Sequence, residues 1–163
     1  VKAIQELCVR HNKQLVVYLS MGFGNPYGDP YNEEIVLNWV NELLKNDIRI
    51  LSLADTVGLA TADQVYTMTR HLITSLPDIE IGVHLHSTPD NWRSKMDAAL
   101  RAGCIRFDGA LKGVGGCPMA NDELVGNMDT EKMIDWLGQQ NRLPALNQAA
   151  LAQSLIMANR IFN

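Results

Sequence analysis

Val83-His84-Leu85-His86-Ser87-Thr88 ends an apolar run and places two histidines two residues apart. In a β-strand, side chains at positions i and i+2 point to the same face, with about 6.5–7 Å between their Cβ atoms. Two imidazoles at that spacing can converge on one metal ion, because a bond from zinc to nitrogen is about 2.0–2.1 Å long. The two histidines are therefore either hydrogen-bonded side chains of an ordinary strand or a pair of metal ligands, and the other motifs of the chain distinguish these alternatives.

The segments on either side of this stretch alternate between β-prone apolar runs and amphipathic helical patterns. Strands are expected over residues 15–19, 48–53, 79–86 and 104–108. Helices are expected over residues 1–11, 31–45, 61–76, 88–103, 130–140 and 144–160. Continuous apolar runs are typical of strands buried on both faces, as in parallel sheets. The alternation therefore predicts a parallel α/β fold with right-handed crossovers.

Local signals mark several helix boundaries. Thr61 and Gln64 have the spacing of a capping box, which predicts a helix start at Thr61. Thr88 followed by Pro89 predicts another helix start, because proline is favoured at the first helical position. Gly103 predicts the end of that helix.

Two architectures fit four consecutive β-α units. One is an open doubly wound sheet, and the other is part of a (β/α)8 barrel. A complete barrel needs roughly 250 residues for its eight units. The four units in these 163 residues make half of that number.

Composition and charge exclude several classes of protein. The net charge is −4 and no basic run occurs, which argues against a nucleic-acid partner. No apolar run approaches the ~18–20 residues of a membrane span, so no membrane partner is expected. Cys8, Cys104 and Cys117 form no disulfide framework, which is typical of a reducing compartment and predicts a cytoplasmic protein.

Polar side chains gather where the expected strands end. They are Ser20 after the first strand, Asp55 and Thr56 after the second, His84 and His86 in the third, and Asp108 at the end of the fourth. Both architectures place functional sites at the carboxyl ends of parallel strands. Each residue alone could be a turn former or a cap, but four strands that end in ligands or acid–base groups favour a functional site.

The long loop after the fourth strand adds two further candidates. Cys117 lies among the glycines of residues 113–118, where the alternatives are an incidental surface thiol and a functional cysteine on a hinged loop. Asn127 comes shortly before an expected helix. Its amide could cap that helix, or it could give a neutral oxygen ligand to a hard cation.

Four motifs in order resemble those of the 3-hydroxy-3-methylglutaryl-CoA lyase family. They are SLADTVG at residues 52–58, VHLH at 83–86, GVGGCPMA at 113–120 and GNMDTE at 126–131. This family belongs to a wider group of metal-dependent lyases and Claisen-condensing enzymes built on a TIM barrel, and the cysteine-containing loop is its most specific motif. The resemblance implies that residues 1–163 form a single partial domain, the C-terminal half of the barrel with about strands 5–8, and a fragment of a longer lyase.

The resemblance also implies a set of site residues. His84, His86 and Asn127 would bind a divalent cation, Mg2+ or Mn2+. Cys117 would be the catalytic cysteine of the loop and Asp55 an active-site carboxylate. Three further residues at the same edge are expected to bind substrate, namely Ser20, Thr56 and Asp108.

The implied reaction splits 3-hydroxy-3-methylglutaryl-CoA into acetyl-CoA and acetoacetate, with acyl-CoA as the substrate class. His84 or Asp55 would remove the proton of the tertiary alcohol, and Cys117 would protonate the enolate after loop closure. The alternatives are a related metal-dependent aldolase or acyl-CoA condensing enzyme, or a fragment that is catalytically incomplete in isolation.

Three positions depart from the family pattern. The family's first strand supplies an Asp ligand and an adjacent Arg, and no segment here corresponds to it. Ser87 stands where the family usually has Asp, and Asn25 stands where it usually has Cys before Pro-Tyr. Because that Asp and Arg are missing, the isolated chain is expected to be inactive. A half barrel also leaves two strand edges unpaired, which predicts that the chain associates as a homo-oligomer, most simply a dimer.

Overall fold

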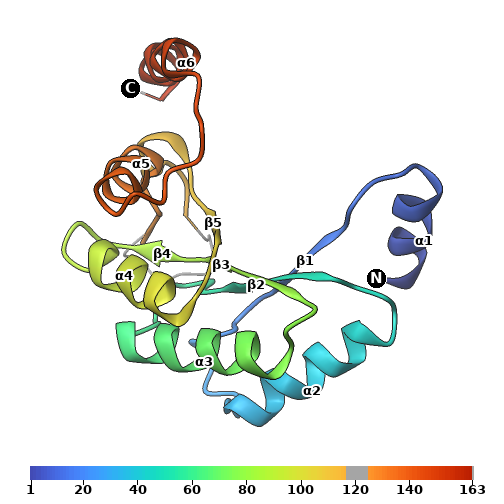
Figure 1. The fold of residues 1–163 in the computed structure, drawn as a ribbon. Coiled ribbons are helices and arrows are strands. Elements are labelled where there is room, and N and C mark those ends of the chain that lie inside the picture. Colours follow the sequence, from blue (N-terminus) through green and yellow to red (C-terminus); the bar gives the residue numbers. More distant parts are fainter. Residues whose placement is uncertain (117–124, 163) are drawn as a thin grey trace.

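The computed structural model describes residues 1–116 and 125–162, and strands and helices alternate along it as the sequence predicts (Figure 1). The elements are α1 (Lys2–Arg10), β1 (Val16–Leu19), α2 (Glu33–Leu44), β2 (Ile50–Ala54), α3 (Ala62–Ser75), β3 (Glu80–His84), β4 (His86–Ser87), α4 (Trp92–Ala102), β5 (Arg106–Asp108), the 3-10 helix η1 (Leu111–Gly113), β6 (Gly126–Asn127), α5 (Thr130–Gln139) and α6 (Gln148–Ile161). No helix of these described ranges is both long and apolar enough to cross a membrane.

The main sheet has four parallel strands in the order β1-β2-β3-β5. The strands follow their order in the sequence, without the reversal that marks a doubly wound sheet. Figure 1 shows α2 and α3 along the same face of the sheet. Sequential parallel strands with helices on one face are the arrangement of neighbouring units in a (β/α)8 barrel. The strands β1 and β5 are the two edges of this sheet.

The core lies between the sheet and its covering helices. Leu51 and Leu53 of β2 are almost completely buried, as are Val65 and Leu72 of α3 and Val83 of β3. All five residues of β2 are buried, because β2 has a strand on each side and is covered on both faces. A buried central strand explains why residues 50–54 are apolar apart from Ser52.

Two predicted helix boundaries are confirmed and one is wrong. The capping box of Thr61 and Gln64 opens α3, and Gly103 ends α4 with φ of +100°. The predicted helix start at Thr88 is wrong, because α4 begins at Trp92. The side chain of Asn91 accepts a hydrogen bond from the Thr88 N–H at 2.8 Å, so residues 88–91 form a turn that delays the helix.

The predicted strand over residues 79–86 is also divided in the structure. β3 ends at His84, and His86 begins β4, which pairs antiparallel with β6 in a separate two-stranded sheet. His86 lies opposite Asn127 and Ser87 opposite Gly126. The chain leaves the main sheet at Leu85 because the returning last loop offers His86 a new strand partner.

Candidate active site

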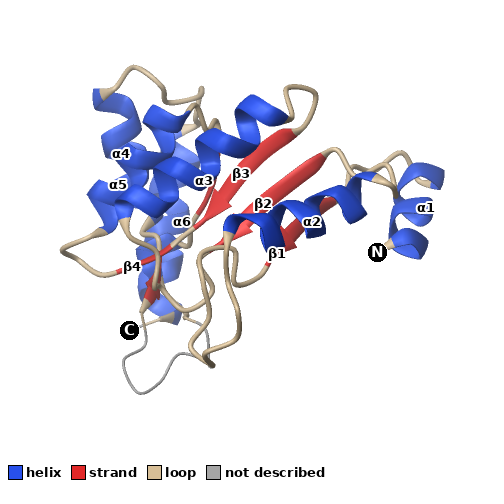
Figure 2. Cartoon of the chain, turned by 90° about the horizontal axis from the view of Figure 1, so that it is seen from below, coloured by secondary structure: helices blue, strands red, loops and turns tan. Residues whose placement is uncertain are grey.

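A cleft of about 490 Å³ opens at the carboxyl ends of the parallel strands. Figure 2 shows the loops that follow the strands gathered at this end of the sheet. The cleft is lined by Tyr18, Ser20, Ala54, Thr56, His84, His86, Gly116 and Asn127. The structure therefore brings together five of the residues that the sequence singled out, namely Ser20 after β1, Thr56 after β2, His84 in β3, His86 in β4 and Asn127 in β6.

The two histidines lie side by side although they belong to different sheets. Their ring centroids are 5.3 Å apart, and the ring planes meet at 75°. Burial lowers the pKa of His84 below its usual 6.5, and the neighbouring His86 lowers it further. His84 is therefore kept neutral, which is the form of imidazole that binds a metal ion.

The hydrogen bonds of His86 select one tautomer of its ring. Nδ1 lies 3.1 Å from the carbonyl oxygen of Val125, and a carbonyl oxygen can only accept. Nδ1 therefore carries the proton, and Nε2 keeps a free lone pair. A carbonyl partner of this kind is how metal-binding histidines are commonly oriented.

Asn127 is held in a similarly defined way. Its Nδ2 donates to the carbonyl oxygen of Val114 at 2.8 Å, which leaves Oδ1 as the free acceptor of the side chain. The alternative role as a helix cap is wrong, because Asp129 caps α5 by accepting from the Lys132 N–H. Asn127 instead pairs with His86 through the backbone of β6.

These donors fit a cation. Nδ1 of His84 is buried without a hydrogen-bond partner, a cost that a bound ion or its water would remove. Two imidazoles and one amide oxygen form a neutral set, and imidazole and carbonyl oxygen are both ordinary ligands of divalent ions. Within the described ranges, no group of three His, Cys, Asp or Glu side chains could hold a metal ion, so no carboxylate joins this set.

Asp55 is directed away from the cleft. Its side chain is 2% exposed and forms an ion pair with Lys95 at 2.7 Å. Its other oxygen accepts from the Ala60 N–H at 2.9 Å. Both oxygens of the carboxylate therefore have partners in the protein interior. Thr56, the next residue, does line the cleft, and its Oγ1 accepts from the Met21 N–H at 2.8 Å.

Asp108 lies behind the cleft and holds a residue that the sequence analysis missed. Its Oδ2 accepts from the Tyr18 hydroxyl at 2.8 Å and from the Ser52 hydroxyl at 3.4 Å. The ring of Tyr18 meets the His84 ring edge-on, with centroids 5.7 Å apart. Burial and the bond to Asp108 raise the pKa of Tyr18, so the phenol is a hydrogen-bond donor at neutral pH. A tyrosine two residues before Ser20, in an otherwise aliphatic run, was the available signal.

Lys95 is the second missed residue. It is 1% exposed and lies in α4 among buried neighbours. A lysine at position 95 falls on the apolar stripe formed by Trp92, Met96 and Ala99, which was a visible anomaly in the helical pattern. Cys117 lies outside the described residues.

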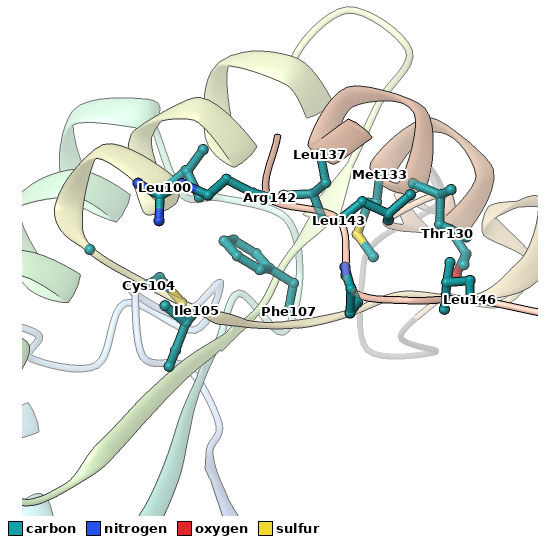
Figure 3. Close-up of a pocket in the computed structure, with 13 residues that line it drawn as sticks. Leu100, Cys104, Ile105, Phe107, Thr130, Met133, Leu137, Arg142, Leu143 and Leu146 are labelled. Carbon is teal, nitrogen blue, oxygen red and sulfur yellow. The ribbon is translucent and has the colours of Figure 1, made fainter. Parts of the chain in front are cut away.

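A second cavity, also of about 490 Å³, lies between β5 and α5 (Figure 3). Its walls are largely apolar, with Phe107 from β5 and Met133 and Leu137 from α5. Arg142 is the one charged side chain among the described residues that line it. Burial raises the pKa of the Cys104 thiol in its wall to about 11, so this cysteine is a neutral packing group. The residues predicted to do chemistry line the first cleft and not this cavity.

The parallel sheet and the cleft define an α/β protein with its site at the carboxyl ends of the strands. The chain belongs to the HMGL-like family, whose model matches residues 2–157. It is 37% identical over 124 residues to the hydroxymethylglutaryl-CoA lyase YngG of Bacillus subtilis strain 168, which covers 76% of this chain and 41% of YngG. It is 31% identical over 118 residues to the (R)-citramalyl-CoA lyase of Chloroflexus aurantiacus, which covers 70% and 37% of the two chains.

A solved structure resembles the fold over nearly the whole chain. It is an HMG-CoA lyase from Acinetobacter baumannii in complex with coenzyme A and 3-methylmalate, with a TM-score of 0.79 and 30% identity. The match covers 93% of this chain and 49% of that one. The aligned chain thus spans less than half the length of each of these three relatives. The predicted family and the parallel α/β fold of its TIM-barrel relatives are confirmed.

Proposed function

We propose that this chain contributes the metal-binding part of a carbon–carbon lyase that cleaves 3-hydroxy-3-methylglutaryl-CoA to acetyl-CoA and acetoacetate. The observation that carries the proposal is the backbone register that pairs His86 with Asn127 beside His84, at the carboxyl edge of a parallel sheet. The names of the relatives, and the coenzyme A in one solved relative, support acyl-CoA as the substrate class.

Lyases of the HMGL-like family generally depend on a divalent metal ion. We assign Mg2+ or Mn2+ to this chain, held by His84, by Nε2 of His86 and by Oδ1 of Asn127. Held there, such a cation would supply Lewis-acid chemistry, a lower pKa for the tertiary hydroxyl of the substrate. The tautomer of His86 and the amide orientation of Asn127 support this assignment, because each leaves one lone pair free.

The side chains of the site would move two protons. The hydroxyl proton leaves to a base, the carbon–carbon bond breaks, and its electron pair forms the enolate of acetyl-CoA, which an acid then protonates at carbon. His84 and Asp55 are the two candidate bases. His84 is the stronger candidate because it lines the cleft, whereas both oxygens of Asp55 are engaged in the interior. Asp55 then has a positioning role.

Measurements of Mn2+ binding separate the ligands from the base. His86→Gln and Asn127→Leu should each weaken Mn2+ binding by about 10-fold or more, with the exposed His11→Gln as the matched control. His84→Gln should do the same if the ring is a ligand, and should reduce turnover alone if the ring is only a base. Acetoacetate release by the full-length gene product should stop when a chelator is added, and activity that persists would refute the metal-dependent reaction.

The catalytic acid is proposed from the sequence motif. Cys117 lies outside the described residues, and its role rests on the GVGGCPMA loop alone. Cys117→Ala should reduce turnover strongly and leave Mn2+ binding intact. Full activity of this variant would remove the cysteine from the mechanism.

Substrate binding is assigned to Ser20, Thr56 and Asp108. Ser20 and Thr56 line the cleft directly, which supports contact with the acyl group. Asp108 would act through Tyr18, whose hydroxyl it holds. Replacement of Ser20 or Thr56 by Ala should raise KM more than it lowers kcat.

The sheet is proposed to be the C-terminal half of a TIM barrel, about strands 5–8. The sequential strand order and the alignment with less than half of each relative support this proposal. The chain by itself would then be inactive, and its edge strands would be covered by another copy. Ile105, next to the edge strand β5, is 80% exposed, which supports such an association. Light scattering should show a dimer or larger species, and a monodisperse monomer would contradict it.

A cytoplasmic location and the absence of nucleic-acid or membrane partners remain predictions from composition. Cys8 and Cys104, the described cysteines, are free thiols, which suits a reducing compartment. Fractionation of the source cells with a thiol-specific label tests this location.

A further inference from the structure

Lys95 is a buried cation that the proposed chemistry does not use. Only 1% of its surface is exposed. Its ammonium group donates to Oδ2 of Asp55 at 2.7 Å, to the carbonyl oxygen of His86 at 2.8 Å and to that of Gly58 at 3.2 Å. An ammonium group has three N–H donors, so these three acceptors use all of them.

The hydrogen bond to His86 lies where the main sheet ends. β3 stops at His84, and the His84 carbonyl still accepts from the Asp55 N–H at 2.9 Å. From His86 onward the chain pairs with β6 and no longer with β2 or β5. The buried carbonyl of His86 therefore finds its donor in a side chain, Lys95.

Lys95 and Asp55 together hold the main chain of both histidines. Asp55 binds the His84 carbonyl through its own N–H, and Lys95 binds the His86 carbonyl while it is paired with Asp55. Only the His86 carbonyl is bound by a side chain of this ion pair, because the bond to the His84 carbonyl comes from the backbone of Asp55. The ring of His86 is oriented by the bond from Nδ1 to the Val125 carbonyl oxygen, and this bond requires the backbone of residue 86 to keep its position.

We propose that Lys95 is a positioning residue that holds the backbone of His86 so that its Nε2 faces the cleft in register with His84 and Asn127. The part of this inference that concerns cation affinity rests on the proposed metal site, and the part that concerns the His86 ring stands without it. Packing alone does not explain a lysine here, because a methionine of similar length would fill the same space without burying a charge.

The experiment separates the hydrogen bond to His86 from the charge balance with Asp55. It compares the protein with Asp55→Asn, Lys95→Met and the double variant Asp55→Asn/Lys95→Met. Asp55→Asn keeps the Lys95 donor to the His86 carbonyl, whereas the double variant lacks this donor and leaves no unpaired charge. Lys45→Met, which removes a lysine whose side chain is 67% exposed, is the matched control. Circular dichroism and the urea midpoint identify the variants that fold.

The first readout is the tautomer of His86 in the metal-free protein, recorded in a long-range 1H–15N spectrum. The wild type and Asp55→Asn should show the proton on Nδ1, and the double variant should show a mixture of tautomers. The second readout is Mn2+ affinity by calorimetry, which should fall about 10-fold or more from Asp55→Asn to the double variant.

Each alternative has its own result. A double variant that keeps the Nδ1–H tautomer, and binds Mn2+ as Asp55→Asn does, would overturn the positioning role and leave Lys95 as a partner of Asp55 only. Tighter Mn2+ binding without Lys95 would overturn it too, since electrostatic repulsion would then be the main effect of the ammonium group. A wild type that binds no Mn2+ refutes the metal site, while the tautomer readout still tests Lys95.

Discussion

Breaking the ion pair between Asp55 and Lys95 should cost a large fraction of the folding stability. Both side chains are 2% exposed and their charged atoms lie 2.7 Å apart. At that distance and an effective dielectric constant of about 20, the Coulomb attraction is about 6 kcal/mol. Part of this offsets the loss of hydration, and removal of one partner of a buried pair costs about 3–5 kcal/mol. Asp55→Asn should therefore destabilise by that amount.

Urea denaturation followed by circular dichroism measures this loss. With an m-value of about 2 kcal/mol per molar urea, the midpoint should fall by about 2 M. Asp97→Asn is the matched control, because Asp97 pairs with Arg101 on the surface of α4, where the side chains are 48% and 62% exposed. That variant should lose about 0.3–0.5 kcal/mol, as exposed helix pairs do.

The double variant Asp55→Asn/Lys95→Met completes the cycle. It leaves no uncompensated charge, so it should be about 2–3 kcal/mol more stable than the sum of the single changes implies. The reasoning is refuted if Asp55→Asn costs no more than Asp97→Asn, or if the two single changes simply add.

Three further results are expected. Gly58→Ala should destabilise more than Gly28→Ala in urea. Both glycines have positive φ, +76° and +75°, but a Cβ at Gly58 would lie 2.7 Å from Val125 Cγ1, and none of the described atoms lies within 4 Å at Gly28, so equal midpoints would contradict this. Because the pKa of His84 in the folded protein lies below 6.5, the contribution of this residue to the free energy of unfolding should be fully present above pH 6.5 and be lost as the pH falls through the folded pKa. Urea denaturation at a series of pH values measures this loss, which should be smaller in His84→Gln. Cys104, with a pKa of about 11, should carry about 100-fold less thiolate at pH 8 than a thiol of pKa 9, so iodoacetamide should modify it only after unfolding, and rapid labelling in the folded state by mass spectrometry would count against this.

The alternation of strands and helices could be predicted because it depends on local periodicity. Residues 50–54 are mostly apolar because β2 is buried on both faces, and the capping box of Thr61 and Gln64 opens α3 as expected. The carboxyl edge of the sheet follows from the same alternation, since parallel strands end on one side. This is why Ser20, Thr56 and His84 could be assigned to one site from the sequence alone.

The details of the site depend on contacts between residues that lie far apart in the sequence. Asn127 reaches His86 through the pairing of β4 with β6, which no local pattern announces. Asp55 and Lys95 are 40 positions apart, and only the tertiary structure shows that the carboxylate of Asp55 is paired with this lysine.

The sequence by itself determined the parallel α/β architecture and the edge that bears the site, because hydrophobic period and helix caps act over a few residues. Only the tertiary structure decided which polar side chains face the cleft. That choice depends on where the chain leaves β3 and on which buried charges find partners, and both are set by packing across the whole domain.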